Sequence, residues 1–309
     1  MEQRQIGSLR VSVLGLGCNN FGWRLDYEQT VAVVDAALAA GIDFLDTADI
    51  YGGTRSEEFL GRALAGRRDR VVLATKFGMA VDEQRKGAHP DYVRRAAEDS
   101  LRRLRTDHLD LYQLHQPDPK TPVADTLGAL DELVRSGKVR EIGCSNFSAA
   151  QLREAEAAAA AAGTARFVSV QNEYSLVHRE PEREVLPECR RLGLAFIPFF
   201  PLASGLLTGK YRHGEPADGT RLTASEGMAR RFLNERNRSI AEALADFAAA
   251  RGHTLLELAF GWLLSRPAVA SVIAGATSAE QVRANVAALG WQLGPDELAE
   301  IDRLAPAGD

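Results

Sequence analysis

Eight short apolar runs, each followed by a longer amphipathic stretch, predict an α/β fold of the (β/α)8 barrel type. Strands connected through helices pair in parallel. An open doubly wound sheet would use the same units, but the first run ends in GLG at residues 15–17 without a Gly-rich fingerprint that opens a helix. The count of eight and the missing fingerprint favour the closed barrel.

The apolar runs have the length of buried strands. They cover residues 11–17, 44–48, 71–76, 109–115, 139–146, 167–172, 194–200 and 271–276. Helical patterns cover residues 26–40, 56–65, 90–104, 123–136, 148–162, 183–192, 237–251, 254–265, 279–289 and 295–304. Ahead of the first strand, Gly7 and Ser8 form the turn of a hairpin that would close the barrel floor.

We expect one barrel domain over residues 1–309, because a single α/β barrel with insertions fits this length. The interval 201–235 is too long and too polar for an ordinary connection, so we expect it to be a functional flap.

Composition narrows the function classes. Hydrophobic residues make up 45% and charged residues 26% of the chain, a typical globular balance. A net charge of −5 gives no electrostatic reason to bind nucleic acid or an anionic membrane. No run approaches the roughly 18 apolar residues of a membrane span, and the first residues lack a signal-peptide pattern. Three widely separated cysteines predict reduced thiols in the cytoplasm rather than a disulfide framework or a metal site.

Four chemically capable residues stand at three consecutive strand ends, where barrel enzymes carry their chemistry. Asp46 ends the second strand, with Tyr51 five residues later; Lys76 ends the third and His115 the fourth. Lys76 terminates an apolar run, so we expect it inside the barrel mouth with Asp46 as its partner. The ammonium group would lower the pKa of Tyr51, so that the phenol donates a proton near neutrality. A neutral His115 would hydrogen-bond the same substrate oxygen.

Each of these residues alone also fits a structural role, as an ion pair, a turn aromatic or a core histidine. The set of four favours acid catalysis at a carbonyl oxygen. The sequence has no HExxH, paired-carboxylate or GxSxG motif, and the set holds no strong nucleophile, so the site needs a hydride donor.

The next strand ends suit a nicotinamide ring. Asn146 and Gln171 could hold a carboxamide, with helix capping as the alternative role, and Phe199 could stack on a flat ring. A pyrophosphate has two candidate sites. One is the turn 201–210, with Gly205 and Lys210; the other is the helix start in 275–285.

These residues lie in segments that resemble the aldo-keto reductases, nearer their bacterial and potassium-channel-β-like branches. The similarity covers essentially the whole chain. The matching segments are GIDFLDTADIYGGTRSEEFLGRAL (41–64), VVLATKFG (71–78), SLRRLRTDHLDLYQLHQPD (100–118), GKVREIGCSNF (137–147), VQNEYSL (170–176), PLASGLLTGKY (201–211) and VIAGATSAEQVRAN (272–285).

The resemblance implies a TIM barrel that uses NADP(H), with NAD(H) not excluded, to reduce aldehydes or ketones to alcohols. Tyr51 would be the general acid, Lys76 and Asp46 would lower its pKa, and His115 would orient the substrate. The flap at 201–235 would cover the cofactor. The residues implied in cofactor binding are Gly17, Cys18, Asp46, Ser145, Asn146, Gln171, Phe199, Phe200, Pro201, Leu202, Ser204, Gly205, Lys210, Arg221, Gly275, Thr277, Gln281 and Asn285.

Two departures from the family pattern concern the cofactor. Phe200 stands where a serine often precedes the Pro-Leu of the phosphate turn. Gly275 and Gln281 stand where better-studied members grip the 2′-phosphate with Lys and Arg. The remaining candidates for that phosphate are Thr277, Ser278, Arg283 and Arg221, so the strictness of the NADPH preference is left open.

The substrate pocket is expected to be aromatic and largely uncharged, which favours uncharged, moderately hydrophobic carbonyl compounds. Loop packing is the alternative role for Phe21 and Trp23. The expected pocket residues are Asn20, Phe21, Trp23, Tyr51, Phe77 and His115.

Two other functions use the same residues. A Schiff-base aldolase would employ Lys76 as nucleophile, but needs a neutral amine, which Asp46 opposes. A cofactor-binding regulatory subunit would have little turnover. The physiological substrate, reaction direction, stereochemistry and oligomeric state are left open by the sequence.

Overall fold

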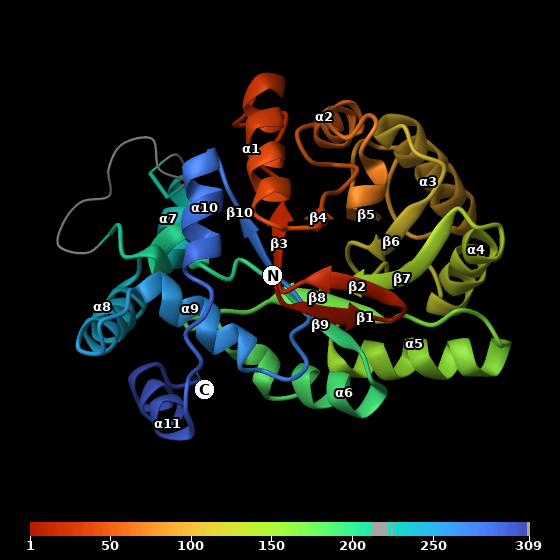
Figure 1. Cartoon of the computed structure of the whole chain (residues 1–309). Coiled ribbons are helices and arrows are strands. Elements are labelled where there is room, and N and C mark those ends of the chain that lie inside the picture. Colours follow the sequence, from red (N-terminus) through yellow and green to blue (C-terminus); the bar gives the residue numbers. More distant parts are fainter. Residues whose placement is uncertain (212–221, 224, 308–309) are drawn as a thin grey trace.

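Eight parallel strands surround a common axis in the order β10-β3-β4-β5-β6-β7-β8-β9 in the computed structural model, which describes residues 1–211, 222–223 and 225–307 (Figure 1). A parallel bridge between Phe196 and Val269 joins the two ends of the sheet. The predicted (β/α)8 barrel is confirmed. The strands are β3 (Leu14–Gly17), β4 (Phe44–Asp46), β5 (Val72–Phe77), β6 (Leu109–Leu114), β7 (Val139–Ser145), β8 (Ser169–Glu173), β9 (Ala195–Phe199) and β10 (Val272–Gly275).

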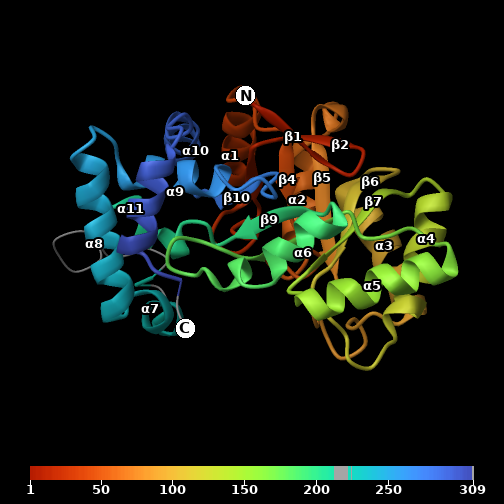
Figure 2. The same cartoon turned by 90° about the horizontal axis from the view of Figure 1, so that it is seen from below.

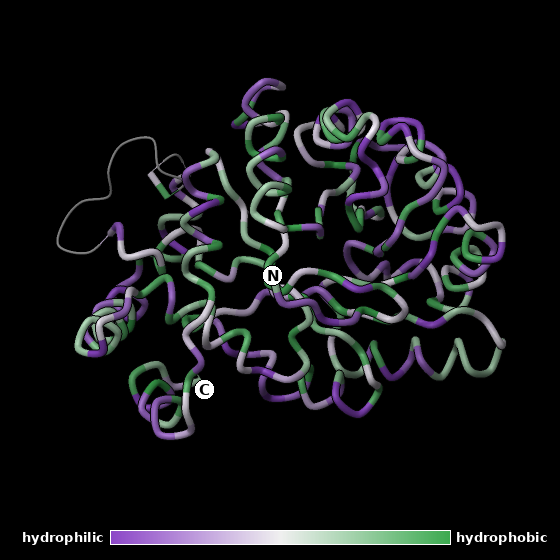
Figure 3. The backbone as a smooth tube through the Cα atoms, in the orientation of Figure 1, coloured by the Kyte–Doolittle hydropathy of each residue, from purple (hydrophilic) through white to green (hydrophobic). Residues whose placement is uncertain are grey.

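Helices surround the barrel, and several begin at a residue that caps their first turn. Asp26, Ser148 and Thr254 each accept a hydrogen bond from the backbone three residues on, in reciprocal capping boxes. Figure 3 shows hydrophilic and hydrophobic positions mixed along the outer helices, as expected when one face packs on the strands. The α-helices are α1 (Tyr27–Ala39), α2 (Arg55–Ala63), α3 (Pro90–Leu104), α4 (Val123–Arg135), α5 (Ala149–Ala162), α6 (Val185–Leu192), α7 (Glu226–Phe232), α8 (Glu235–Ala249), α9 (Leu255–Leu264), α10 (Ala279–Ala287) and α11 (Pro295–Leu304), and the short 3-10 helices are η1 (Arg68–Arg70), η2 (Glu180–Glu182) and η3 (Ala203–Thr208).

A two-stranded antiparallel hairpin, β1 (Gln3–Ile6) and β2 (Leu9–Ser12), lies across the amino-terminal mouth of the barrel (Figures 1 and 2). Its turn contains Gly7 at a φ of +57°, as predicted. The expected first strand at 11–17 is wrong in one respect, because residues 11–12 belong to β2 and only 14–17 to β3. The apolar run hides this break because both segments are buried, Val11 in the cluster under the barrel and Leu14 and Leu16 in the main core.

The barrel interior is layered, because side chains two residues apart on a strand point the same way. The hairpin contributes Ile6, Leu9 and Val11 to a buried apolar cluster. Above the hairpin residues, the same cluster contains a layer of strand residues: Phe44, Ala74, Leu111, Ile197 and Ile273. Each of them lies two positions before a strand residue at the carboxyl-terminal mouth of the barrel. The layer above it therefore begins with Asp46, Lys76 and Gln113 on β4, β5 and β6.

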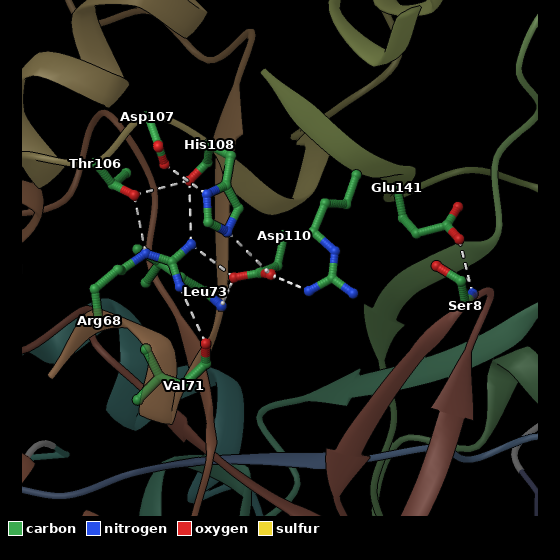
Figure 4. Close-up of polar contacts among 10 residues, drawn as sticks. Ser8, Arg68, Val71, Leu73, Thr106, Asp107, His108, Asp110 and Glu141 are labelled. Atoms are coloured by element: carbon green, nitrogen blue, oxygen red, sulfur yellow. Dashed lines mark hydrogen bonds and ion pairs between the residues drawn. The ribbon is translucent and has the colours of Figure 1, made fainter. Parts of the chain in front are cut away.

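A polar network closes the amino-terminal end of β6 (Figure 4). The buried Asp110 carboxylate accepts hydrogen bonds from Arg68 (2.7 Å), the Leu73 amide (2.9 Å) and Arg140 (2.6 Å). Nearby, Glu141 on β7 accepts from the Ser8 amide of the hairpin turn at 2.7 Å. Contacts at this end of a barrel serve stability rather than chemistry.

Candidate active site

A cavity of about 810 Å³ opens at the carboxyl ends of the strands. All the residues implied in cofactor binding line it, except Arg221, which lies outside the described residues. The lining residues in this set are Gly17, Cys18, Asp46, Ser145, Asn146, Gln171, Phe199, Phe200, Pro201, Leu202, Ser204, Gly205, Lys210, Gly275, Thr277, Gln281 and Asn285. Ser278 and Arg283, the other candidates for the 2′-phosphate, do not line the cavity.

A buried ion pair lies at the base of this cavity. The Lys76 side chain is 0% exposed, and its Nζ donates to Asp46 Oδ2 at 2.6 Å and to the Thr47 carbonyl at 2.8 Å. The other Asp46 oxygen accepts from Gln171 at 3.0 Å and Gln113 at 3.2 Å. Burial lowers the pKa of Lys76 more than any other single cause, but the interactions of Lys76 with Asp46 and Tyr51 together outweigh it, so that pKa is raised. The lysine is therefore a permanent cation.

Tyr51 lies beside this cation at the cavity wall. Lys76 Nζ is 5.2 Å from the centroid of the Tyr51 ring. The predicted lowering of the phenol pKa is not the net result: burial raises the pKa of Tyr51 more than the Lys76 ammonium lowers it, and Asp46 raises it further. The phenol therefore keeps its proton at neutral pH, which is the state that a general acid needs.

His115 completes the group. Its ring packs edge-on against the Tyr51 ring, with centroids 5.8 Å apart and an interplanar angle of 79°. Burial, helped by the Lys76 charge, lowers the pKa of His115 to about 3, so the imidazole is neutral. Its Nδ1 is buried without a hydrogen-bond partner. A bare acceptor is the less costly state for such a nitrogen, so we assign the proton to Nε2 on hydrogen-bonding grounds.

The amides of Asn146 and Gln171 are held rigidly by the protein. The Asn146 nitrogen donates to the His115 carbonyl at 2.9 Å and to Ser145 Oγ at 3.2 Å. Ser145 Oγ in turn donates to the Gln171 carbonyl at 2.7 Å. With their nitrogens engaged inside the protein, the two amides can offer a ligand their oxygen atoms.

The turn after β9 has an unusual backbone. Phe200, Ala203 and Ser204 have φ values of +51°, +46° and +57°. Such strain in non-glycine residues concentrates at ligand-binding sites. A Cβ on Gly205 would lie 2.8 Å from both Nζ and Cε of Lys210, so the missing side chain lets this ammonium fold over the turn. Ser204 Oγ is buried there without a partner.

The far end of the cavity is formed by β10, the start of α10 and the loop after β3. Ser278 caps α10, and the Gln281 side chain folds back to accept from the Thr277 amide at 2.9 Å. Asn20 donates to the Ala276 carbonyl at 3.2 Å, while its Oδ1 is buried and unpartnered. Unsatisfied buried groups at a cavity wall indicate room for a polar ligand.

Three of the six residues expected to form the substrate pocket line the cavity. Asn20, Tyr51 and His115 line the cavity, whereas Phe21 and Phe77 are both 0% exposed and absent from its wall. Phe77 follows the inward-facing Lys76 and therefore points outward, where it stacks on Tyr112 with centroids 4.7 Å apart. Phe21 belongs to the apolar core, and Trp23 is 61% exposed outside the cavity lining.

Sequence reasoning also missed several lining residues, which come from loops, from η3 and β10 and from helices α9 and α10. Arg24 is the most notable of them, since it adds a guanidinium group to the loop after β3. The missed residues are Arg24, Met79, Thr208, Leu256, Ile273, Ala274 and Ala284. Within the described ranges, no three His, Cys, Asp or Glu side chains form a group that could hold a metal ion, and no described helix has the length and apolar character of a membrane span.

Fold and site together describe a barrel whose cavity, at the carboxyl ends of the strands, contains a phenol and an imidazole above a buried ion pair. The chain belongs to the aldo/keto reductase family, whose model matches residues 13–306. It is 37% identical over 321 residues to the uncharacterized oxidoreductase YrpG of Bacillus subtilis, covering 99% of this chain and 96% of that protein. It is 33% identical over 307 residues to the probable aldo-keto reductase 1 of Glycine max, covering 97% and 87%. Family membership implies oxidoreduction of carbonyl compounds.

Proposed function

We propose that this protein reduces aldehydes or ketones to alcohols by hydride transfer from NAD(P)H, with Tyr51 as the general acid. The observation that carries this proposal is the cavity-facing phenol beside the fully buried Lys76–Asp46 pair and the neutral His115. The proposed substrate is a small carbonyl compound. The three cysteines are free and buried, which supports a reducing, cytoplasmic location.

The cavity fits a nicotinamide dinucleotide along its length. The Asn146 and Gln171 oxygens would accept from the carboxamide, and Phe199 would stack on the ring. The unpartnered Ser204 hydroxyl, the Gly205 backbone and Lys210 would hold the pyrophosphate. Thr277 and Gln281 would contact the adenosine end. NADP(H) is the proposed cofactor, and NAD(H) is the alternative.

The protein's own residues then act on the substrate oxygen. The bound cofactor supplies the hydride. Nε2 of His115 and the Tyr51 hydroxyl both donate hydrogen bonds to the carbonyl oxygen, which orients and polarises it. As negative charge develops on that oxygen, Tyr51 transfers its proton to it. The Lys76 ammonium stabilises the resulting phenolate, and Asp46 keeps Lys76 in place.

The test is steady-state oxidation of NADPH and of NADH with a panel of uncharged aldehydes and ketones. Turnover supports the proposal, and the ratio of the two kcat/KM values gives the cofactor preference. Binding of NADPH without turnover across the panel would instead indicate a regulatory subunit. The raised pKa of Lys76 disfavours a Schiff-base aldolase. Borohydride trapping of a substrate adduct on Lys76 would reverse that judgement.

A further inference from the structure

A buried carboxylate at the end of β8 is bound by a helix that lies far along the chain. Arg231, in α7, pairs through its guanidinium group with the Glu173 carboxylate. The Glu173 side chain is 10% exposed and the Arg231 side chain 49% exposed. The pair therefore fastens α7 to the carboxyl end of the barrel, two residues along β8 from Gln171.

The same guanidinium group contacts aromatic rings that lead to the cavity. It lies 5.1 Å from the Phe232 ring centroid and 5.9 Å from that of Phe200. The Phe200 ring packs edge-on against Phe232 at 5.7 Å and against Phe199 at 5.4 Å. Phe199 and Phe200 line the cavity, so the contacts run without a break from Glu173 to the cavity wall.

Backbone geometry shows what this chain of contacts holds in place. Phe200 has a φ of +51°, a left-handed conformation that a bulky side chain adopts only when its surroundings enforce it. Phe200 is also the first residue of the turn whose Ser204 and Gly205 face the proposed pyrophosphate. On the barrel side, Glu173 pairs in register with Phe199. The ion pair thus braces the turn next to the aromatic platform.

We propose that Glu173 and Arg231 are positioning residues for the cofactor: they clamp Phe200 in its left-handed conformation and so set the rate at which the dinucleotide leaves. The inference rests on the proposed function, since the ligand is the nicotinamide cofactor. Neither residue lines the cavity, so each acts through Phe200 and the turn. Removing the pair should weaken retention of the cofactor without removing any of the groups that contact it.

The experiment measures the dissociation rate of NADPH from the full-length protein, by stopped-flow fluorescence with excess NADP+ as the chase. Glu173→Gln and Arg231→Gln should each accelerate dissociation about tenfold, and the double variant no more than either alone, because both remove one interaction. Arg230→Gln is the matched control. Arg230 adjoins Arg231 on α7, but its side chain is 75% exposed, and its ion pair in the described part of the chain is a local one with Glu226. Dissociation should therefore stay within about twofold of wild type.

Phe200→Gly separates the ring from the backbone, because glycine adopts a positive φ without strain. It should accelerate dissociation and abolish the further effect of Arg231→Gln. Arg231→Lys keeps the charge, and should restore part of the retention if a glutamine variant folds poorly. Folded Glu173→Gln and Arg231→Gln variants that release NADPH at the wild-type rate would overturn this inference alone. A wild-type protein that binds neither NADPH nor NADH would overturn the proposed function as well.

Discussion

The two ends of the barrel each contain a buried aspartate with a full set of partners, yet only one of them serves a cavity. Asp46 accepts from Lys76, Gln113 and Gln171 at the carboxyl end. Asp110 accepts from Arg68, Arg140 and the Leu73 amide at the floor (Figure 4).

The two aspartates differ in the surroundings of the cations that pair with them. The Lys76 side chain is 0% exposed and lies next to a cavity-facing phenol, whereas the side chains of Arg68 and Arg140 are 16% and 49% exposed and neither lines the cavity. A buried ion pair by itself is therefore a structural element. We expect it to influence chemistry when its cation lies next to a proton-carrying group in a cavity.

The largest expected effect is at the phenol. Tyr51→Phe should lower kcat for carbonyl reduction by about 10²–10⁴-fold, because it removes the proton donor to the developing alkoxide. The Kd for NADPH, measured by fluorescence titration, should stay nearly unchanged, since the hydroxyl acts on the substrate oxygen. Retention of most of the turnover would refute the assignment of Tyr51 as the acid.

Removing the cation at the active end should damage both activity and stability. Lys76→Met leaves Asp46 as an unpaired buried charge, so we expect the free energy of unfolding to fall by about 3–5 kcal/mol and turnover to be lost. Urea unfolding followed by circular dichroism gives the first value. Adding Asp46→Asn to the lysine variant should recover much of the stability but none of the activity. An unchanged unfolding midpoint in Lys76→Met would contradict the burial of the pair.

A third acid, Asp49, sharpens the comparison because it is buried without a cation of its own. It is 2% exposed, one oxygen has no partner, and the other accepts from Tyr92 at 3.3 Å. The Arg103 guanidinium, whose charge acts on Asp49, is engaged by Glu57 at 2.6 Å. Burial, followed by repulsion from Glu57, raises the pKa of Asp49 from 3.8 to about 7.

The raised pKa of Asp49 makes the free energy of unfolding depend on pH. The folded state holds the proton more tightly than the unfolded state, so the contribution is complete below pH 3.8 and is lost as the pH rises to about 7. Between pH 5 and pH 8 the free energy of unfolding should fall by about 2–3 kcal/mol on this account. Asp49→Asn should remove that dependence, which urea titrations at both pH values will measure. Equal slopes in the two proteins would show that Asp49 is ionised throughout.

The smallest effect is expected at the floor. Asp110→Asn weakens hydrogen bonds to arginines that can hydrate, so we expect a loss of about 1.5 kcal/mol in unfolding free energy. The kcat/KM for carbonyl reduction should remain within about twofold of wild type. If activity in this variant dropped as far as in Lys76→Met, the distinction between the two ends would be lost.

The sequence was sufficient for the parts of the molecule that follow a repeating pattern. Strand and helix periodicity predicted the barrel, and three consecutive strand ends brought Asp46, Tyr51, Lys76 and His115 to one cavity. The outward direction of Phe77 was also within reach, because adjacent side chains on a strand alternate. We had instead assigned Phe77 to the substrate pocket from its position after Lys76.

Other features depend on tertiary contacts that no local pattern contains. The net pKa of Tyr51 is set by how deeply its oxygen is buried, which outweighs the charge that the sequence reveals. Arg24 and Leu256 reach the cavity from a loop and from a helix start that are far apart in the chain. The break between β2 and β3 lies within one apolar run, and α7 lies in a segment with no clear periodicity.

The hairpin at the barrel floor also affects the electrostatics of the opposite mouth. Ile6, Leu9 and Val11 plug the bottom with hydrocarbon, and one further apolar layer separates them from the ammonium of Lys76. The hairpin and this layer therefore separate the ammonium from the solvent beneath the barrel. A chain without the hairpin would admit water to the barrel interior from below. The higher local dielectric constant would then weaken the interaction between the Lys76 ammonium and the Tyr51 phenol.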